Sequence, residues 1–231
     1  MDVALVFSNV EAKLRARWWW LAVFVMAAAG LWVTLDLSDR TRHDLRSFDG
    51  HDVGKIETAM WRSYYDHRRV RLFLELTELL RRQYHLPFWQ ANVAAYHAAR
   101  GAVVFQRGHN RNEYMLALPD LESFYATIRR HSETDFNVDT AARLELEWWI
   151  IHRERANHAA SDLELALAQL QAQIYNRPVT EFAAHAKARA DAMLLRDDRA
   201  ASAGAPTDRD WRTIGTLLDR SWVDLQNVVS R

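Results

Sequence analysis

The chain has no cysteine, and this absence removes several kinds of chemistry at once. Without thiols there is no disulfide framework, no thiolate nucleophile and no Cys-ligated zinc or iron–sulfur centre. Glycine and proline are scarce as well, with seven and four among 231 residues, whereas Ala, Leu, Arg and Glu are abundant. Few turn residues disfavour β-hairpins, and the abundant residues favour helices. We therefore expect an all-α protein whose length suits one domain and an anchor.

A net charge is also missing, because 30 basic and 30 acidic residues cancel. A neutral chain has no overall field that would attract nucleic acid, so no nucleic-acid partner is expected. The sequence shows no Gly-rich phosphate loop and no recognisable Ser/His/Asp order. We therefore predict no catalytic residues and no cofactor.

One long apolar run lies near the N-terminus, from Trp18 to Leu35, without an ionisable side chain. With Leu37 it reaches the roughly 20 residues that a helix needs to cross about 30 Å of hydrocarbon. A cleavable signal peptide or a buried core helix is the alternative. Three Trp open the run and large residues occupy positions 31–33, where signal cleavage needs small ones. We therefore expect an uncleaved transmembrane helix over residues 18–37. Its expected membrane-interface residues are Trp18, Trp19, Trp20 and Trp32.

The charges around this run suggest an orientation. Three cations precede it within the tail 1–17, and three follow it between residues 40 and 46. A short cationic tail resists translocation, whereas a long following domain crosses largely regardless of charge. We predict a single-pass protein of the bacterial inner membrane, with a cytoplasmic N-terminus and a periplasmic or otherwise extracytoplasmic domain. The tail is either an interfacial helix or a frayed terminus. The apolar positions of that helix would be Val3, Phe7, Val10 and Leu14.

The remainder divides into a polar linker over residues 38–52 and a helical domain over residues 53–231. Periodic apolar residues predict an irregular bundle of about six to seven helices. The first helix spans 56–84, either unbroken or as two collinear helices that meet near 66–68. The helix 139–158 is expected to be central and most buried, and the last helix carries an apolar stripe that packs on the domain or on a partner. The other helices are predicted at 88–106, 119–132, 161–175, 180–196 and 207–229.

Glu and His on the helix 139–158 raise the question of a metal site, since helical bundles build di-metal centres from such residues. Those centres use Glu-x-x-His, whereas the pair here, Glu154 and His158, is four residues apart. The remaining ligands would have to come from Glu57, His85 or His97. Glu154 and His158 are thus weak candidates, and no metal is predicted.

Two further clusters have a functional and a structural interpretation. Glu145 and Glu147 beside two Trp could serve acid–base chemistry on a sugar. The favoured interpretation buries one of them against an arginine such as Arg62 or Arg143 and leaves the other solvated. The aromatic and basic stretch 60–71 could bind an anionic ligand or lipid headgroup. We favour a core stripe flanked by solvated charge.

The leading functional hypothesis is a non-catalytic accessory or scaffold subunit of a larger bacterial membrane complex, for instance of respiratory or photosynthetic type. Its partners would be the lipid bilayer and other subunits of that complex. The rival is a membrane-tethered ligand-binding or sensor module. A weaker alternative is a metal-dependent enzyme that uses the Glu and His of the helix 139–158. The candidate pocket or interface residues are Trp61, Tyr64, Trp89, Trp148, Trp149, Trp211 and Trp222.

Overall fold

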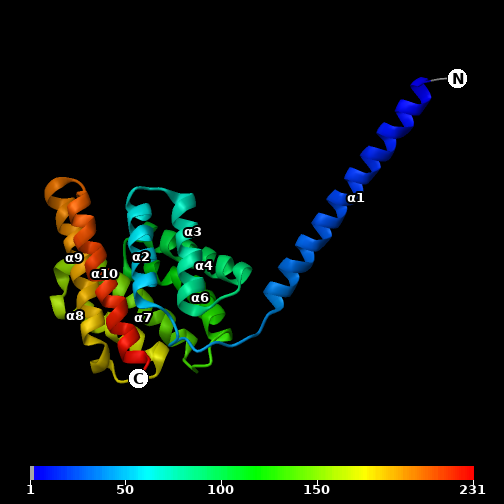
Figure 1. Ribbon diagram of the computed structural model, residues 1–231. Coiled ribbons are helices and arrows are strands. Elements are labelled where there is room, and N and C mark those ends of the chain that lie inside the picture. The colour runs from blue at the N-terminus through cyan, green and yellow to red at the C-terminus, as the bar shows by residue number, and fades with distance from the viewer. Residues whose placement is uncertain (1–2) are drawn as a thin grey trace. The chain divides into compact units, whose positions relative to one another are not determined.

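The computed structural model describes residues 3–231, and it describes side chains from Arg17 onward, except that of Ala160. The chain separates after Asp39 into an N-terminal helical unit and a folded unit, residues 40–231. The described residues form helices, joined by turns and loops, with no named strand among them (Figure 1). The all-α prediction is therefore confirmed.

The first unit is the helix α1, Val3–Ser38. Its segment Arg17–Ser38 has 22 residues with a mean hydropathy of 1.9, and is long and apolar enough to cross a membrane. Among the described residues, its most apolar window is 0% buried, and the four expected interface tryptophans are between 51% and 70% exposed. The apolar positions expected on the tail lie outside the described side chains.

The segment expected to be a polar linker is largely part of the folded unit. The N–H of His43 donates to the carbonyl of His131 at 2.7 Å, and the His43 carbonyl accepts from the N–H of Glu133 at 3.0 Å. Leu45 and Phe48 are 0% and 5% exposed. Two apolar side chains and a short backbone pairing are thus enough to fix residues 43–48 against the domain, although the composition is that of a linker.

The first predicted helix is two helices, α2 (Gly50–Tyr65) and α3 (Arg69–Tyr84). The break lies at 66–68, as expected, but the helices are not collinear. His67 adopts a left-handed conformation with φ of 57°, the chain reverses, and α3 packs against α2 (Figure 1). The collinear interpretation is therefore wrong.

The later helices follow the predicted order with shifted ends. The Pro119 and Thr207 helix starts are confirmed, since Pro119 lies in the first turn of α6 and Thr207 caps α10 together with Asp210. The helix predicted to reach His158 ends at Arg153, and the one predicted to end near Arg196 continues to Ala203. Their bounds are α4 (Phe88–Arg107), α5 (Arg111–Tyr114), η1 (Met115–Ala117), α6 (Leu118–Arg130), α7 (Val138–Arg153), η2 (Arg155–Asn157), α8 (Ala160–Tyr175), η3 (Val179–Phe182), α9 (Ala183–Ala203) and α10 (Asp208–Val229).

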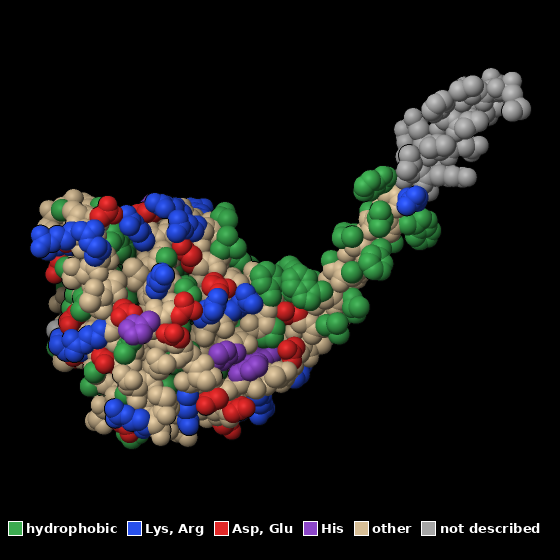
Figure 2. Space-filling view, in the orientation of Figure 1, with side chains coloured by type: hydrophobic (Ala, Val, Ile, Leu, Met, Phe, Trp, Pro, Cys, Tyr) green, Lys and Arg blue, Asp and Glu red, His purple; other side chains and the backbone are tan. Residues whose placement is uncertain are grey.

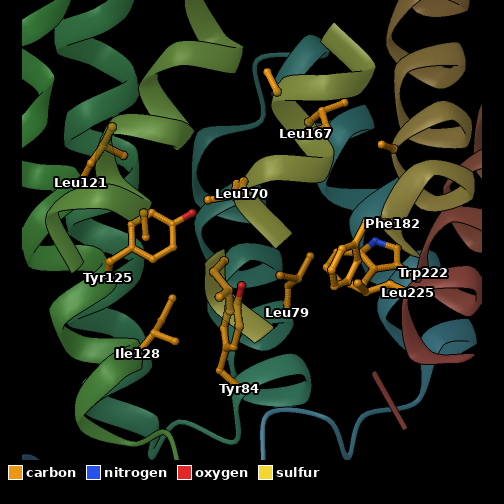
Figure 3. Close-up of a cluster of buried hydrophobic side chains, with 14 of the residues drawn as sticks. Leu79, Tyr84, Leu121, Tyr125, Ile128, Leu167, Leu170, Phe182, Trp222 and Leu225 are labelled. Carbon is orange, nitrogen blue, oxygen red and sulfur yellow. The ribbon is translucent and has the colours of Figure 1, made fainter. Parts of the chain in front are cut away.

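The eight longer helices of residues 40–231 close into a ring. Each packs against the next, in the order α2, α3, α4, α6, α7, α8, α9 and α10, and α10 packs against α2. Large side chains from around the ring meet in its interior (Figure 3). Those labelled there are Leu79, Tyr84, Leu121, Tyr125, Ile128, Leu167, Leu170, Phe182, Trp222 and Leu225.

The contact that closes the ring depends on glycine. A Cβ at Gly54 of α2 would lie 2.7 Å from the Cα of Asp219 on α10, and one at Gly50 would lie 2.8 Å from the carbonyl oxygen of Trp222. The two glycines are one helical turn apart, so they lie on the same side of α2. Their missing side chains allow the two backbones to approach closely.

Two expectations about burial have different outcomes. The stripe of α10 packs inward, with Ile214, Leu218 and Leu225 at 0% exposure, so it covers the domain rather than a partner. The helix α7 is not the central element, because its main contacts are with α6 and α8 on the ring, and Trp148 and Trp149 are only partly buried. The tryptophan-rich helix α7 is therefore one member of the ring, and only one of its sides faces the interior.

Candidate functional site

A buried ion pair joins α2 to α9 beside the contact that closes the ring. The carboxylate of Glu57, 2% exposed, accepts two hydrogen bonds from Arg189 at 2.6 and 2.8 Å. The indole N–H groups of Trp61 and Trp222 donate to the same carboxylate at 3.2 and 2.5 Å. The Arg189 guanidinium lies 5.8 and 5.9 Å from the centres of these two rings. Four donors and one counter-charge therefore satisfy Glu57 within the fold.

A second carboxylate, Glu145 of α7, has no cation in direct contact among the residues whose side chains are described. It accepts hydrogen bonds from the Tyr125 hydroxyl at 2.7 Å and from the Trp149 indole at 3.0 Å. Removal from water raises the pKa of Glu145, because burial disfavours the charged form. Burial also raises the pKa of Tyr125 well above its ordinary value, so this hydroxyl remains a donor. The arrangement corrects the expected pairing: the arginines Arg62 and Arg143 bind Asp208 and Asp139 instead.

A histidine and a serine meet between α9 and α10. His185 Nδ1 lies 2.9 Å from both the carbonyl oxygen and the hydroxyl of Ser221. Burial lowers the pKa of His185 to about 4, so the imidazole is neutral at ordinary pH. The two residues are 1% and 0% exposed, which leaves no surface through which a substrate could reach the hydroxyl. The pair therefore acts as a link between helices in this conformation.

The predicted aromatic residues do not gather around one pocket. Trp61 and Trp222 share Glu57, whereas Trp149 contacts Phe105 and Glu145. Trp211 packs near Tyr65, and Tyr64 is 45% exposed. Trp148 lies beside Trp149 on α7, and Trp89 beside Phe88 on α4. The seven residues are distributed around the ring.

The residues considered for metal binding are also apart. Glu154 caps the end of α7, and His158 lies 3.6 Å from Asp162. His97 contacts Asp120, and His85 contacts Ser47. Among the described residues no three His, Asp or Glu side chains are placed to hold one ion. The histidines that contact an acidic side chain here do so in separate pairs, and most of these pairs lie near the surface.

The surface carries an apolar region that the sequence pattern did not reveal. Val70 and Leu74 of α3 are 77% and 61% exposed, although Val70 lies in the stretch 60–71, which we expected to provide a core stripe. Exposed apolar side chains continue on α4 and η1, which pack against each other, while α3 packs against α4. Figure 2 shows hydrophobic side chains at the surface on this side of the domain. We call this region the α3–α4 face; it consists of Val70, Leu74, Val93, Tyr96, Val103 and Leu116.

A groove of about 1060 Å³ runs between α2 and α10. Figure 2 shows Lys and Arg side chains and a histidine over these helices. Three arginines of the aromatic and basic stretch, Arg62, Arg68 and Arg71, line it. We call it the α2–α10 groove, and its lining is His51, Lys55, Thr58, Ala59, Arg62, Ser63, Arg68, Arg71, Asp208, Trp211, Arg212, Gly215, Thr216 and Asp219.

Comparison of the chain with models of known protein families, with curated proteins and with solved structures finds no match in any of the three.

Proposed function

We propose that this chain is a non-catalytic accessory subunit of a larger bacterial membrane complex. It is anchored by the apolar segment of α1, and its folded unit binds another subunit through the α3–α4 face. The cationic tail before the anchor favours a cytoplasmic N-terminus and a domain on the opposite side of the membrane. The observation that carries the proposal is the exposure of the α3–α4 face.

Exposed apolar side chains on neighbouring helices are unusual for a domain that works alone. Isolated apolar residues are common on surfaces, but a group of them usually marks a contact with another protein or with lipid. The most exposed members, Val70, Leu74 and Leu116, are 77%, 61% and 66% exposed. Fully burying one such side chain contributes about 1.5–3 kcal/mol, so a partner that covers this face gains a stabilising contribution from each of them.

The distribution of buried polar groups supports binding over chemistry. Glu57, Glu145 and His185 have partners inside the fold, and the aromatic residues expected around a ligand do not line one cavity. A ligand between the helices would have to separate this packed interior. An interaction at the surface requires no such change.

Mild-detergent extraction of native membranes through a tag after Arg231, with native electrophoresis and mass spectrometry, tests the proposal. The wild-type chain should migrate in a larger assembly with stoichiometric partners. The double substitution Leu74→Ser with Val103→Ser on the α3–α4 face should release the chain from the assembly. Each substitution removes about 1.5 kcal/mol or more of apolar burial from the contact with the partner.

Leu165→Ser is the matched control, because Leu165 is an exposed leucine of α8, at 52%, outside this face. It should leave the assembly intact. A wild-type chain that is recovered alone would refute a subunit role. A complex that survives the double substitution would refute this face as the contact.

A further inference from the structure

We propose that the α2–α10 groove binds an acidic peptide segment of a partner protein. The α2–α10 groove is distinct from the α3–α4 face, because the two share no lining residue. It forms where Gly54 and Gly215 bring α2 and α10 together: a Cβ at Gly215 would lie 3.2 Å from the side chain of Thr58. The long side chains on either side of this close crossing form the walls.

The walls carry an excess of positive charge in a chain that is neutral as a whole. Five lysine and arginine side chains line the groove, against two carboxylates. Both carboxylates are already bound across it, Asp208 to Arg62 at 2.5 Å and Asp219 to His51 at 2.8 Å. Both carboxylates are therefore already paired with side chains that line the groove.

Two of the cations are available to a partner. Arg68 pairs with Asp66 and Arg71 with Glu75, at 2.8 Å each, so neighbouring carboxylates outside the lining offset their charge. Lys55 and Arg212 are exposed and have no ion pair among the described residues. They lie on opposite walls, Lys55 on α2 and Arg212 on α10, and an anionic chain in the groove would pass between them.

The shape favours an extended anion over a single phosphate. His51, Lys55 and Arg62 are distributed along α2 over about 17 Å, the rise of eleven helical residues. The N-terminus of α10, the usual seat for a compact anion, is already capped by Thr207 and Asp210 and begins with Asp208. The middle of the groove is lined by small or uncharged groups, Thr58, Ala59 and Gly215, against which a peptide backbone fits.

Fluorescence anisotropy of the detergent-solubilised full chain with a labelled oligoglutamate tests this proposal. We expect saturable binding that weakens as salt rises toward physiological strength. Lys55→Glu with Arg212→Glu should raise the Kd at least tenfold. The matched control is Arg107→Glu with Arg130→Glu, exposed cations at the ends of α4 and α6 outside the groove, and it should change the Kd less than twofold.

Equal weakening by both double variants would overturn the proposal, because the attraction would then be unspecific. Competition by inorganic phosphate or tripolyphosphate at lower concentration than by unlabelled oligoglutamate would also overturn it, in favour of a phosphate site. The same measurement on Leu74→Ser with Val103→Ser separates the two surfaces. Those substitutions should leave peptide binding unchanged even where they release the subunit from its complex.

Discussion

Replacing Arg189 by Met tests whether the buried Glu57 carboxylate depends on its counter-charge. Met keeps the length and apolar stem of the side chain, but the carboxylate, 2% exposed, is left with only the indole donors of Trp61 and Trp222. Breaking a buried ion pair by removing one partner costs about 3–5 kcal/mol. For a folded unit of this size each kcal/mol lowers the Tm by about 2–4 °C, so we expect a loss of about 6–20 °C.

Thermal unfolding of the full chain in detergent, followed by circular dichroism, measures this loss of stability. Glu57→Gln in the Arg189→Met background removes the charge and retains an oxygen that can accept from the indoles. It should recover part of the lost stability. A deficit below about 1 kcal/mol, the value of an exposed pair, would refute the reasoning.

Two further predictions concern the same contact between α9, α10 and α2. Because the pKa of His185 is lowered from 6.5 to about 4, the unfolded chain takes up this proton first as the pH falls. The contribution of the neutral His185 to the free energy of unfolding is fully present above about pH 6.5. It decreases by up to about 3 kcal/mol as the pH falls toward 4. Urea unfolding at several pH values should show that His185→Gln flattens this slope relative to the wild type, and an unchanged slope would contradict it. Gly54→Ala should be destabilising despite the better helix propensity of Ala, because its Cβ would lie 2.7 Å from the Asp219 Cα. Gly101→Ala is the matched control, since its nearest neighbour is a side-chain atom at 3.5 Å, and it should be neutral or stabilising by up to about 1 kcal/mol; equal effects would show that the crossing can open.

The helices themselves were largely predictable from local signals. Pro119 and the Thr207 cap determine helix starts through the geometry of their own backbone or side chain. The reversal at His67 was not predictable, because a left-handed residue other than glycine leaves no pattern in the sequence. The break was therefore located correctly, but the direction of the next helix was not.

Long-range partners explain most of what the sequence analysis missed. Glu57 and Arg189 are 132 residues apart, and nothing near either residue indicates the other. Gly50 lies within the segment predicted as a linker, although its role is a close approach to α10 that exists only in the folded ring. The exposure of Val70 has the same origin, since apolar periodicity locates a stripe but not the neighbour that would cover it.

The placement of polar groups gives the strongest argument about function. A catalytic base must come within hydrogen-bond reach of a substrate proton, and a nucleophile must be accessible. Three residues with the chemistry for such roles, Glu57, His185 and Ser221, are 2%, 1% and 0% exposed and are held by other parts of the fold. By contrast, exposed apolar side chains such as Leu74 and free cations such as Lys55 are on the surface. Since binding uses exposed groups that lack partners, this distribution supports the proposal of two docking surfaces on the helical ring, and separate substitution of Leu74 and Lys55 tests their roles.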